Sequence, residues 1–356
     1  MLKLGNRELE IPIIQGGMGV GVSLGNLAGT VAGCGAMGVI STVNAGYRED
    51  DFEKNPIQAN VRALRQEIKK ALDIAKGKGI VAINAMVAVN RYEESVKAAI
   101  DAGVQAVISG AGLPLALPKL TKGTECMAAP IVSSGKAASV ICKNWDRKYG
   151  VAPDFVVIEG PEAGGHLGFS REQIENHTAK SVYDIFPEVK EAIEPYEEKY
   201  DREIPVFLAG GIFDGADMAK ATDAGASGVQ MATRFIATTE CDASEEYKRV
   251  IVDASEDDVT IIKSPVGMPG RALLTPLIQK LQQGEKFAPK ICNDCLKSCP
   301  HGTKTPYCIS RALIEAVKGN VREGLFFCGS NVGKIKKIVS VRELIDEIVS
   351  EWRKSS

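Results

Sequence analysis

The chain has 356 residues, a length that suits one large α/β barrel with an appendage or two domains of average size. Hydrophobic residues make up 45% of it and charged residues 25%, which are ordinary globular values. Lys+Arg 43 against Asp+Glu 45 leaves a net charge of -2, which gives no support to a nucleic-acid partner or an anionic membrane surface. No apolar run reaches the ~20 residues of a membrane helix, and the N-terminus lacks the apolar core of a signal peptide. We therefore expect a soluble, cytoplasmic protein with no membrane partner.

Short apolar runs alternate with amphipathic segments through the first two thirds of the chain. The runs predict eight strands, at residues 11–14, 37–42, 80–86, 105–110, 128–133, 155–159, 204–211 and 228–233. Helices are predicted between them at 23–36, 56–76, 92–102 and 216–224. Continuously apolar strands indicate burial on both faces, and their alternation with helices indicates a parallel sheet. Eight such units match a TIM (β/α)8 barrel, which typically has ~250 residues. A doubly wound open sheet is the alternative, although it usually has fewer strands.

Two stretches do not fit the repeat. Residues 167–200 are polar, acidic and helix-like, and they separate the sixth predicted strand from the seventh. Residues 241–356 follow the predicted barrel, which we assign to residues 1–240. This C-terminal part holds a loop at 264–271, a group of cysteines and an amphipathic helix at 341–349. We expect it to pack on the barrel and cover its mouth as a lid.

A glycine turn presents one histidine directly after the sixth predicted strand. The sequence there reads Glu159-Gly160-Pro161-Glu162-Ala163-Gly164-Gly165-His166, and the chain has only three histidines. An imidazole near neutral pH can accept a carbon-bound proton, or can hold an anionic substrate when it is charged. His166 is therefore the predicted catalytic residue. His177 and His301 lie in polar segments and are predicted to be surface residues.

Phosphate-type signals follow three successive strands. They are Gly164-Gly165, Gly210-Gly211 and Ala232-Thr233. Backbone N–H groups of such turns, with a hydroxyl and a helix N-terminus, can hold a phosphate, and barrels often place this site in their last βα loops. One glycine pair alone can simply pack a helix on a strand, but three at successive strand ends predict a phosphate-bearing cofactor.

Polar or permissive residues end several other strands. The turn containing Gly17 and Met18 would let the backbone lie against a flat ring. The alternative is that it is simply a tight turn. Asn84 ends an apolar strand, and its amide could meet the edge of a flavin ring, cap a helix or bond another strand.

Two further strand ends extend this prediction. Gln230, beside Met231, has the same interpretation as Asn84. Glu159 could accept a hydrogen bond from a ribityl chain or cap the next helix. No GxGxxG turn opens a dedicated nicotinamide domain, and no nucleophile elbow supports hydrolysis.

Together these motifs resemble the nitronate monooxygenase family, formerly the 2-nitropropane dioxygenases, which includes the related FMN-dependent enoyl-acyl carrier protein reductases. The matching elements are residues 12–18, Asn84 with Met86, 109–114, 159–168, 209–212 and 230–235. The likeness spans about residues 8–240 and resumes weakly at 321–349. The chain departs from the family pattern in two ways. Ala232 stands where a glycine is common, and the larger departure is the cysteine-bearing insert in the C-terminal part.

The resemblance implies a barrel that binds FMN without a covalent bond. It implies phosphate contacts from Gly165, Gly211 and Thr233, with Met18 and Asn84 near the ring, and His166 as base or anion binder.

In nitronate oxidation, the flavin takes an electron from an alkyl nitronate and returns electrons to oxygen. In the reductase branch, NAD(P)H reduces FMN, which passes hydride to an enoyl thioester. We rank nitronate oxidation first and thioester reduction second, and a flavin or metal redox sensor is a third alternative. The partner is a small-molecule substrate, and a homodimer is left open.

Nine cysteines fall into two sets. Five are scattered in apolar surroundings and are predicted to be buried small hydrophobes: Cys34, Cys126, Cys142, Cys241 and Cys328. The other four form the cysteine cluster, Cys292-x2-Cys295-x3-Cys299-x8-Cys308.

Four soft ligands so close together suit a 4Fe–4S cluster or zinc, and free or redox-active thiols are the alternative. The spacing is not that of a zinc ribbon, whereas other flavin barrels that reduce enoyl thioesters carry a similar run that binds a 4Fe–4S cluster. A metal there could simply staple a loose lid. An exposed iron–sulfur cluster would favour an oxygen-poor cell and hence the reductase activity.

Overall fold

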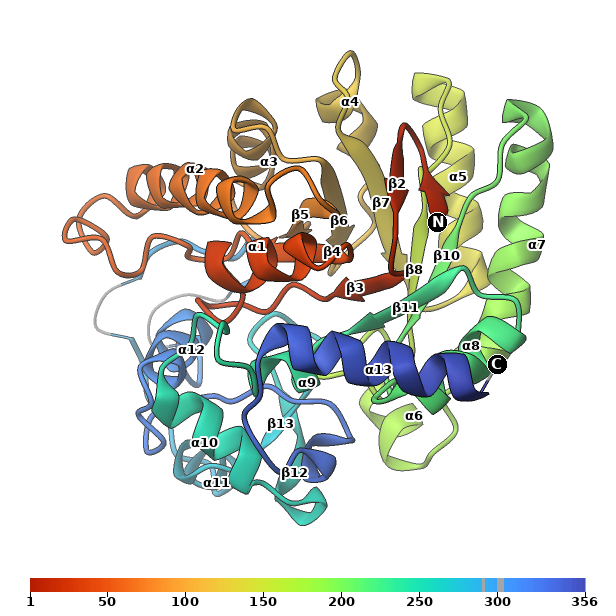
Figure 1. Cartoon of the computed structure of the whole chain (residues 1–356). Helices are drawn as coiled ribbons and strands as arrows, with labels where there is room; N and C mark the ends of the chain where they lie inside the picture. Colours follow the sequence, from red (N-terminus) through yellow and green to blue (C-terminus); the bar gives the residue numbers. More distant parts are fainter. Residues whose placement is uncertain (290–291, 300–303, 356) are drawn as a thin grey trace.

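The structure is a computed structural model that describes residues 1–289, 292–299 and 304–355. Eight parallel strands close into a barrel in the order β10-β11-β3-β4-β5-β6-β7-β8 (Figure 1). Their bounds are β3 Ile13–Gln15, β4 Met37–Ser41, β5 Ile80–Met86, β6 Ala106–Gly110, β7 Met127–Val132, β8 Val156–Glu159, β10 Val206–Ala209 and β11 Gly228–Met231. The predicted TIM barrel is confirmed, and pairing of Ile14 with Gln230 closes the circle that an open sheet would lack.

Helices surround the barrel and alternate with its strands. They are α1 Gly25–Gly33, α2 Pro56–Ala75, α3 Tyr92–Asp101, α4 Leu117–Thr121, α5 Gly135–Tyr149, α6 Arg171–Glu175, α7 Val182–Tyr200 and α8 Gly215–Asp223. Glycine permits the closest of these contacts: a Cβ on Gly38 would lie 1.8 Å from the carbonyl oxygen of Ala28, so α1 rests directly on β4. The polar stretch at 167–200 supplies α6 and α7, each begun by a serine capping box.

The amino-terminal end of the barrel is closed by a small hairpin. Strands β1 Leu2–Leu4 and β2 Arg7–Leu9 pair antiparallel. Leu4 and Leu9 are fully buried in the cluster that fills the barrel, with Phe155 and Phe207. Since all eight barrel strands are parallel, their carboxyl ends meet at the other end, where barrel enzymes place their sites.

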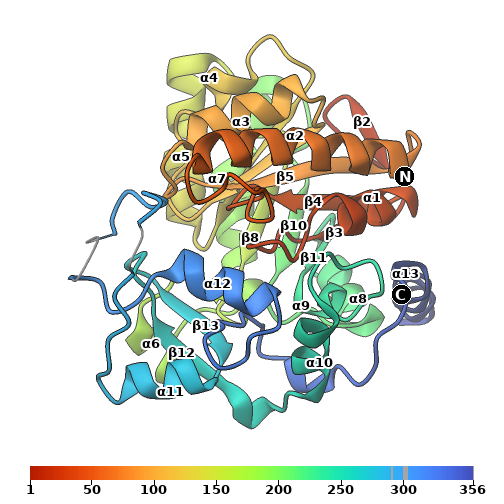
Figure 2. The same ribbon diagram turned by 90° about the vertical axis from the view of Figure 1, so that its left-hand side faces the viewer.

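The C-terminal part builds a second layer over that open end (Figures 1 and 2). The short helix α9 Thr233–Ile236 follows the last barrel strand. The elements of the C-terminal part are α10 Glu245–Asp253, η1 Glu256–Asp258, β12 Val259–Lys263, β13 Pro269–Leu273, α11 Pro276–Gln282, α12 Ile309–Val317 and η3 Val332–Lys334. The last helix, α13 Val341–Ser355, lies instead along α8 and α1 on the outside of the barrel. The domain division at 240/241 stays a prediction. No helix in the described ranges is long and apolar enough to cross a membrane.

One predicted loop is partly wrong. Residues 264–271 were expected to form a loop, but residues from Pro269 onward belong to β13. This strand pairs with β12 and also with β9 Gly165–His166, which makes a three-stranded antiparallel sheet. The partner β9 lies about a hundred positions earlier in the sequence, so no local pattern around 264–271 announces the pairing.

Candidate functional site

Two adjoining cavities open at the mouth of the barrel. The first, the mouth cavity, is lined by ten residues selected from the sequence: Gly17, Met18, Asn84, Glu159, Gly164, Gly165, His166, Gln230, Ala232 and Thr233. The second, the side cavity, is lined by the remaining three, Gly210, Gly211 and Met231, and shares five residues with the first. The fold thus brings all the selected mouth residues together, although whether they hold a cofactor stays a proposal.

The glycines at this mouth are needed for close approach. A Cβ on Gly17 would lie 2.4 Å from the Cβ of Asn84, and one on Gly164 would lie 2.5 Å from the backbone of Cys328. Gly165, Gly210 and Gly211 have φ values of 76°, 89° and 85°, which other residues adopt only with strain. Backbone therefore borders both cavities where side chains would otherwise fill them.

A C-terminal segment, residues 327–331, closes the side cavity. The N–H of Gly329 donates to the Thr233 hydroxyl at 2.8 Å, and the Asn331 amide donates to the carbonyl of Gly211 at 2.7 Å. Phe327 and Cys328 line the mouth cavity. These contacts were not predicted, although a Gly-Ser-Asn triplet directly after a buried apolar run was a usable signal.

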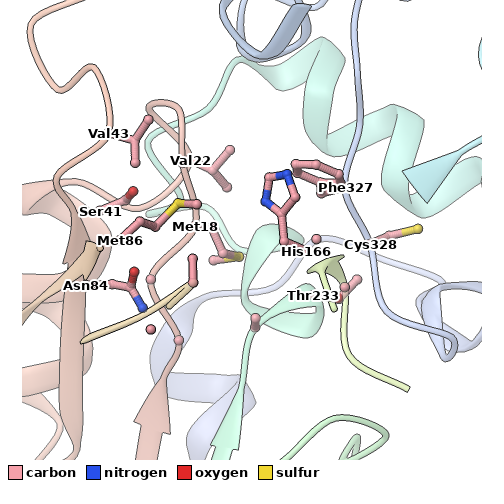
Figure 3. A pocket seen from close by; sticks show the side chains of 18 of the residues that line it. Met18, Val22, Ser41, Val43, Asn84, Met86, His166, Thr233, Phe327 and Cys328 are labelled. Carbon is pink, nitrogen blue, oxygen red and sulfur yellow. The ribbon is translucent and has the colours of Figure 1, made fainter. Parts of the chain in front are cut away.

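His166 stands at the edge of the mouth cavity, opposite Met18, Asn84 and Met86 (Figure 3). Its Nε2 is 2.7 Å from the Ser264 hydroxyl, and the edge of its ring faces Phe327 at 5.2 Å between centroids. Burial lowers the pKa of His166 to about 4, because the charged imidazolium would lose its hydration there. The ring is therefore neutral near pH 7, which suits a base and disfavours a resting cationic anion binder.

The loop that carries His166 is held by a buried arginine. The Arg271 guanidinium donates to the carbonyls of Pro161 and Ala163, at 2.6 and 2.7 Å. The side chain is 9% exposed, so these carbonyls receive their hydrogen bonds away from water. Arg271 was missed as a site residue because its partners lie far away in the sequence.

Glu159 and Gln230 lie where the two cavities meet. Burial raises the pKa of Glu159 to about 7, so its carboxyl group changes protonation near neutral pH and can then donate or accept. The Gln230 side chain packs beside Gly16, where an added Cβ would lie 3.3 Å from it. Their contacts with a cofactor stay a prediction.

A channel reaches the mouth cavity from the surface. It shares Val43, Met86, His166 and Leu313 with that cavity and continues past Leu296 of the cysteine-bearing loop. Its outer lining includes charged side chains, among them the exposed Lys54 and Arg91. The residues that the two cavities share beside His166 are all apolar: Val43, Met86 and Leu313.

The four clustered cysteines line one small cavity: Cys292, Cys295, Cys299 and Cys308. The Ser310 hydroxyl donates to the sulfur of Cys295 at 3.0 Å. Within the described residues, no three His, Cys, Asp or Glu side chains are arranged to hold a metal ion. The metal site stays a prediction.

The other cysteines and histidines can be placed as well. The five scattered cysteines are all buried, as predicted: Cys34, Cys126, Cys142, Cys241 and Cys328. His177 is exposed, also as predicted, and His301 lies outside the described residues.

Comparisons with known proteins agree with this geometry. The family described as nitronate monooxygenase matches residues 2–351. The chain is 26% identical to "(3aS,4S,5R,7aS)-5-hydroxy-7a-methyl-1-oxo-octahydro-1H-indene-4-carboxyl-CoA dehydrogenase" of Mycobacterium tuberculosis, over 96% of this chain and 92% of that protein. It is 26% identical to a "Probable nitronate monooxygenase" of Staphylococcus saprophyticus, over 79% of this chain and 81% of that protein.

Solved structures share the whole architecture. FabK from Thermotoga maritima superposes with a TM-score of 0.72 at 27% identity, covering 98% of this chain and 94% of that one. A nitroalkane oxidase from Streptomyces ansochromogenes gives a TM-score of 0.70 at 21% identity, covering 98% and 97%, and this likeness speaks for the fold alone.

Proposed function

The chain is an oxidoreductase of the nitronate monooxygenase family, and from that premise we propose that it binds FMN across the mouth and side cavities. The supporting observation is that two adjoining cavities are bordered by glycine backbone. The phosphate would lie in the side cavity against Gly211 and Thr233, beside positive-φ turns whose N–H groups suit an anion. The ring would lie in the mouth cavity, against the backbone of Gly17 and the amide of Asn84.

When bound, FMN supplies the electron chemistry, while the chain binds, orients and moves a proton. His166 is the proton acceptor in this proposal. A neutral imidazole can take the carbon-bound proton of a nitroalkane, whose bonding electrons stay behind on the resulting nitronate. The resulting imidazolium then lies beside the nitronate anion. His166 would thus act first as the base and afterwards as the anion binder. The first substrate class is therefore the alkyl nitronates and the nitroalkanes that yield them.

The test is flavin reduction under anaerobic conditions, followed by stopped-flow absorbance. Purified protein loaded with FMN is mixed separately with an alkyl nitronate, with NADH and with NADPH. Fast bleaching by the nitronate without a nicotinamide supports nitronate oxidation. A colourless protein that added FMN does not restore would remove the flavin proposal altogether.

Acyl thioester chemistry is the second candidate, and the channel favours it. The channel adds apolar residues such as Leu296 and Ile309 to the lining near His166, and an acyl chain could lie against them. One relative is named as acting on a carboxyl-CoA compound, which is a thioester. In the reductase form of this candidate, NADH or NADPH would bleach the flavin quickly and an enoyl thioester would restore its colour. Bleaching by neither nicotinamide would remove the reductase form.

We also propose that the cysteine cluster binds zinc or an iron–sulfur cluster in its own small cavity. Its support is that all four thiols share one cavity beside the channel, since four thiolates suit zinc or an iron–sulfur cluster. We expect protein purified under argon to carry iron or zinc, and Cys308→Ser to lose it, by elemental analysis. Cys142→Ser, at a buried site elsewhere, is the matched control. Metal-free wild-type protein, even after reconstitution, would leave the thiols as free or redox-active groups.

A further inference from the structure

His166 is fixed by two elements that come from opposite parts of the chain. Its own strand, β9, pairs with β13, where His166 is opposite Gly270, and the N–H of Leu167 donates to the carbonyl of Pro269 at 2.9 Å. The turn that leads into β13 carries Ser264, which is 3% exposed and whose hydroxyl lies 2.7 Å from Nε2 of the imidazole. The strand pairing thus sets the backbone of His166, and Ser264 contacts its ring.

The Ser264 hydroxyl is itself held in place. The N–H of Val266 donates to its oxygen at 3.2 Å, and the N–H of Gly267 donates to the Ser264 carbonyl at 3.0 Å. A hydroxyl has one proton and two lone pairs. With one lone pair used by Val266, the oxygen can still accept Nε2–H or donate its proton to a bare Nε2.

This contact leaves the other ring nitrogen for the cavity. With Nε2 directed at Ser264, Nδ1 is on the side where Met18 and Met86 lie (Figure 3). Within the described ranges, Nδ1 has no protein hydrogen-bond partner. A proton that leaves a substrate in the mouth cavity would therefore arrive at Nδ1.

We propose that Ser264 is a positioning residue that holds Nε2 so that Nδ1 faces the substrate in the form able to accept a proton. In that form, Nε2–H donates to the Ser264 oxygen and Nδ1 carries a lone pair. When Nδ1 takes the proton, Nε2–H keeps the same acceptor and the hydrogen bond becomes charge-assisted, which stabilises the imidazolium. This inference rests on the proposed role of His166 as base and is independent of which substrate donates the proton.

Three variants of FMN-loaded, full-length protein test it. Ser264→Ala removes the acceptor, Ser264→Thr restores a hydroxyl, and Ser298→Ala is the matched control. Ser298 donates to the carbonyl of Val266 at 3.2 Å, so it supports the same turn without touching His166. The readouts are FMN content, the ¹⁵N NMR shifts of the His166 ring against pH, and kcat and KM with two substrates. These are a nitroalkane, whose carbon-bound proton needs a base, and its nitronate, which has already lost that proton.

We expect Ser264→Ala to lower kcat with the nitroalkane by roughly tenfold to a hundredfold, a part of what a general base contributes. KM and FMN content should stay near wild type, Ser264→Thr should recover most of the rate, and Ser298→Ala should keep it. The ring shifts should show Nε2–H in wild type and a mixture of tautomers in Ser264→Ala. Unchanged kcat and unchanged tautomer in Ser264→Ala would overturn the proposal, as would an equal loss of rate in Ser298→Ala.

The failure of this inference can be separated from failure of the proposed function. If His166→Asn stops turnover and Ser264→Ala does not slow it, only the positioning role falls. If His166→Asn retains turnover, the base assignment itself falls. The NMR shifts need no substrate, so they decide the positioning geometry even where neither substrate is turned over.

Discussion

The barrel and the C-terminal layer contribute different things to the same site. The barrel supplies backbone: glycine turns and strand ends that leave room at the mouth. The C-terminal layer supplies side-chain contacts that finish the site, among them Ser264 on the histidine and Arg271 under its loop. The difference teaches that the glycine-bordered wall of the mouth is encoded locally, whereas the placement of His166 depends on partners brought from far along the chain.

The largest expected effect is on turnover when His166 is replaced, since this residue contacts Ser264 and pairs with β13 of the C-terminal layer. His166→Asn should lower turnover by roughly 10²–10⁴-fold, the usual contribution of a general base. FMN content should stay near wild type, because the glycine turns are unchanged. His177→Asn is the matched control, since that residue is exposed and its φ of 53° is one that asparagine tolerates. Full turnover of a nitroalkane by His166→Asn would contradict the assignment.

A single added methyl group should disturb the glycine backbone that borders the mouth cavity. Gly17→Ala would put a Cβ 2.4 Å from the Cβ of Asn84, so the turn must move into the mouth cavity. We expect FMN affinity to fall by at least about tenfold, which corresponds to about 1.4 kcal/mol, by fluorescence titration of the flavin-free protein. Gly33→Ala is the control, because the nearest atom to its added Cβ is 3.5 Å away. Equal flavin affinity in both variants would mean that the turn does not border the ring.

Removing the buried arginine should destabilise the junction between the two regions. Arg271→Met leaves the carbonyls of Pro161 and Ala163 without their donor, at a cost of about 2 kcal/mol in the free energy of unfolding. Chemical denaturation measures the change. Arg311→Met, whose exposed partner Glu323 is 4.0 Å away, should change stability by less than about 0.5 kcal/mol. A similar loss in both variants would argue against a special role for Arg271.

The last prediction concerns pH dependence and tests how far His166 is shielded from water. In flavin-free protein, NMR should show the His166 ring titrating near pH 4, well below its ordinary 6.5, because burial disfavours the charged form. Since the unfolded chain binds this proton more readily, the contribution of His166 makes the fold less stable as pH falls from 6.5 toward 4. His166→Asn should remove that part of the slope. A ring midpoint near 6.5 would show that the histidine is solvated.

Much of this molecule followed from local sequence. The eight strands were predictable from short continuous apolar runs, and the helices between 23 and 102 from the amphipathic segments between those runs. The flanking glycines have local backbone requirements. The site residues at strand ends followed too, because parallel strands of a barrel deliver their carboxyl ends to one mouth. What failed was the end of the stretch at 264–271, where residues from Pro269 onward form β13, which pairs with β12 along five residues and with β9 at two.

The sequence by itself therefore determined the barrel, its glycine-bordered mouth and the one histidine presented there. Only the tertiary structure decided which groups meet that histidine. Ser264 lies 98 positions away along the chain, and Phe327 comes from later still. Hydrogen bonds and ring contacts of this kind leave no periodic trace in the sequence, because they depend on how separate elements pack rather than on how any one of them folds.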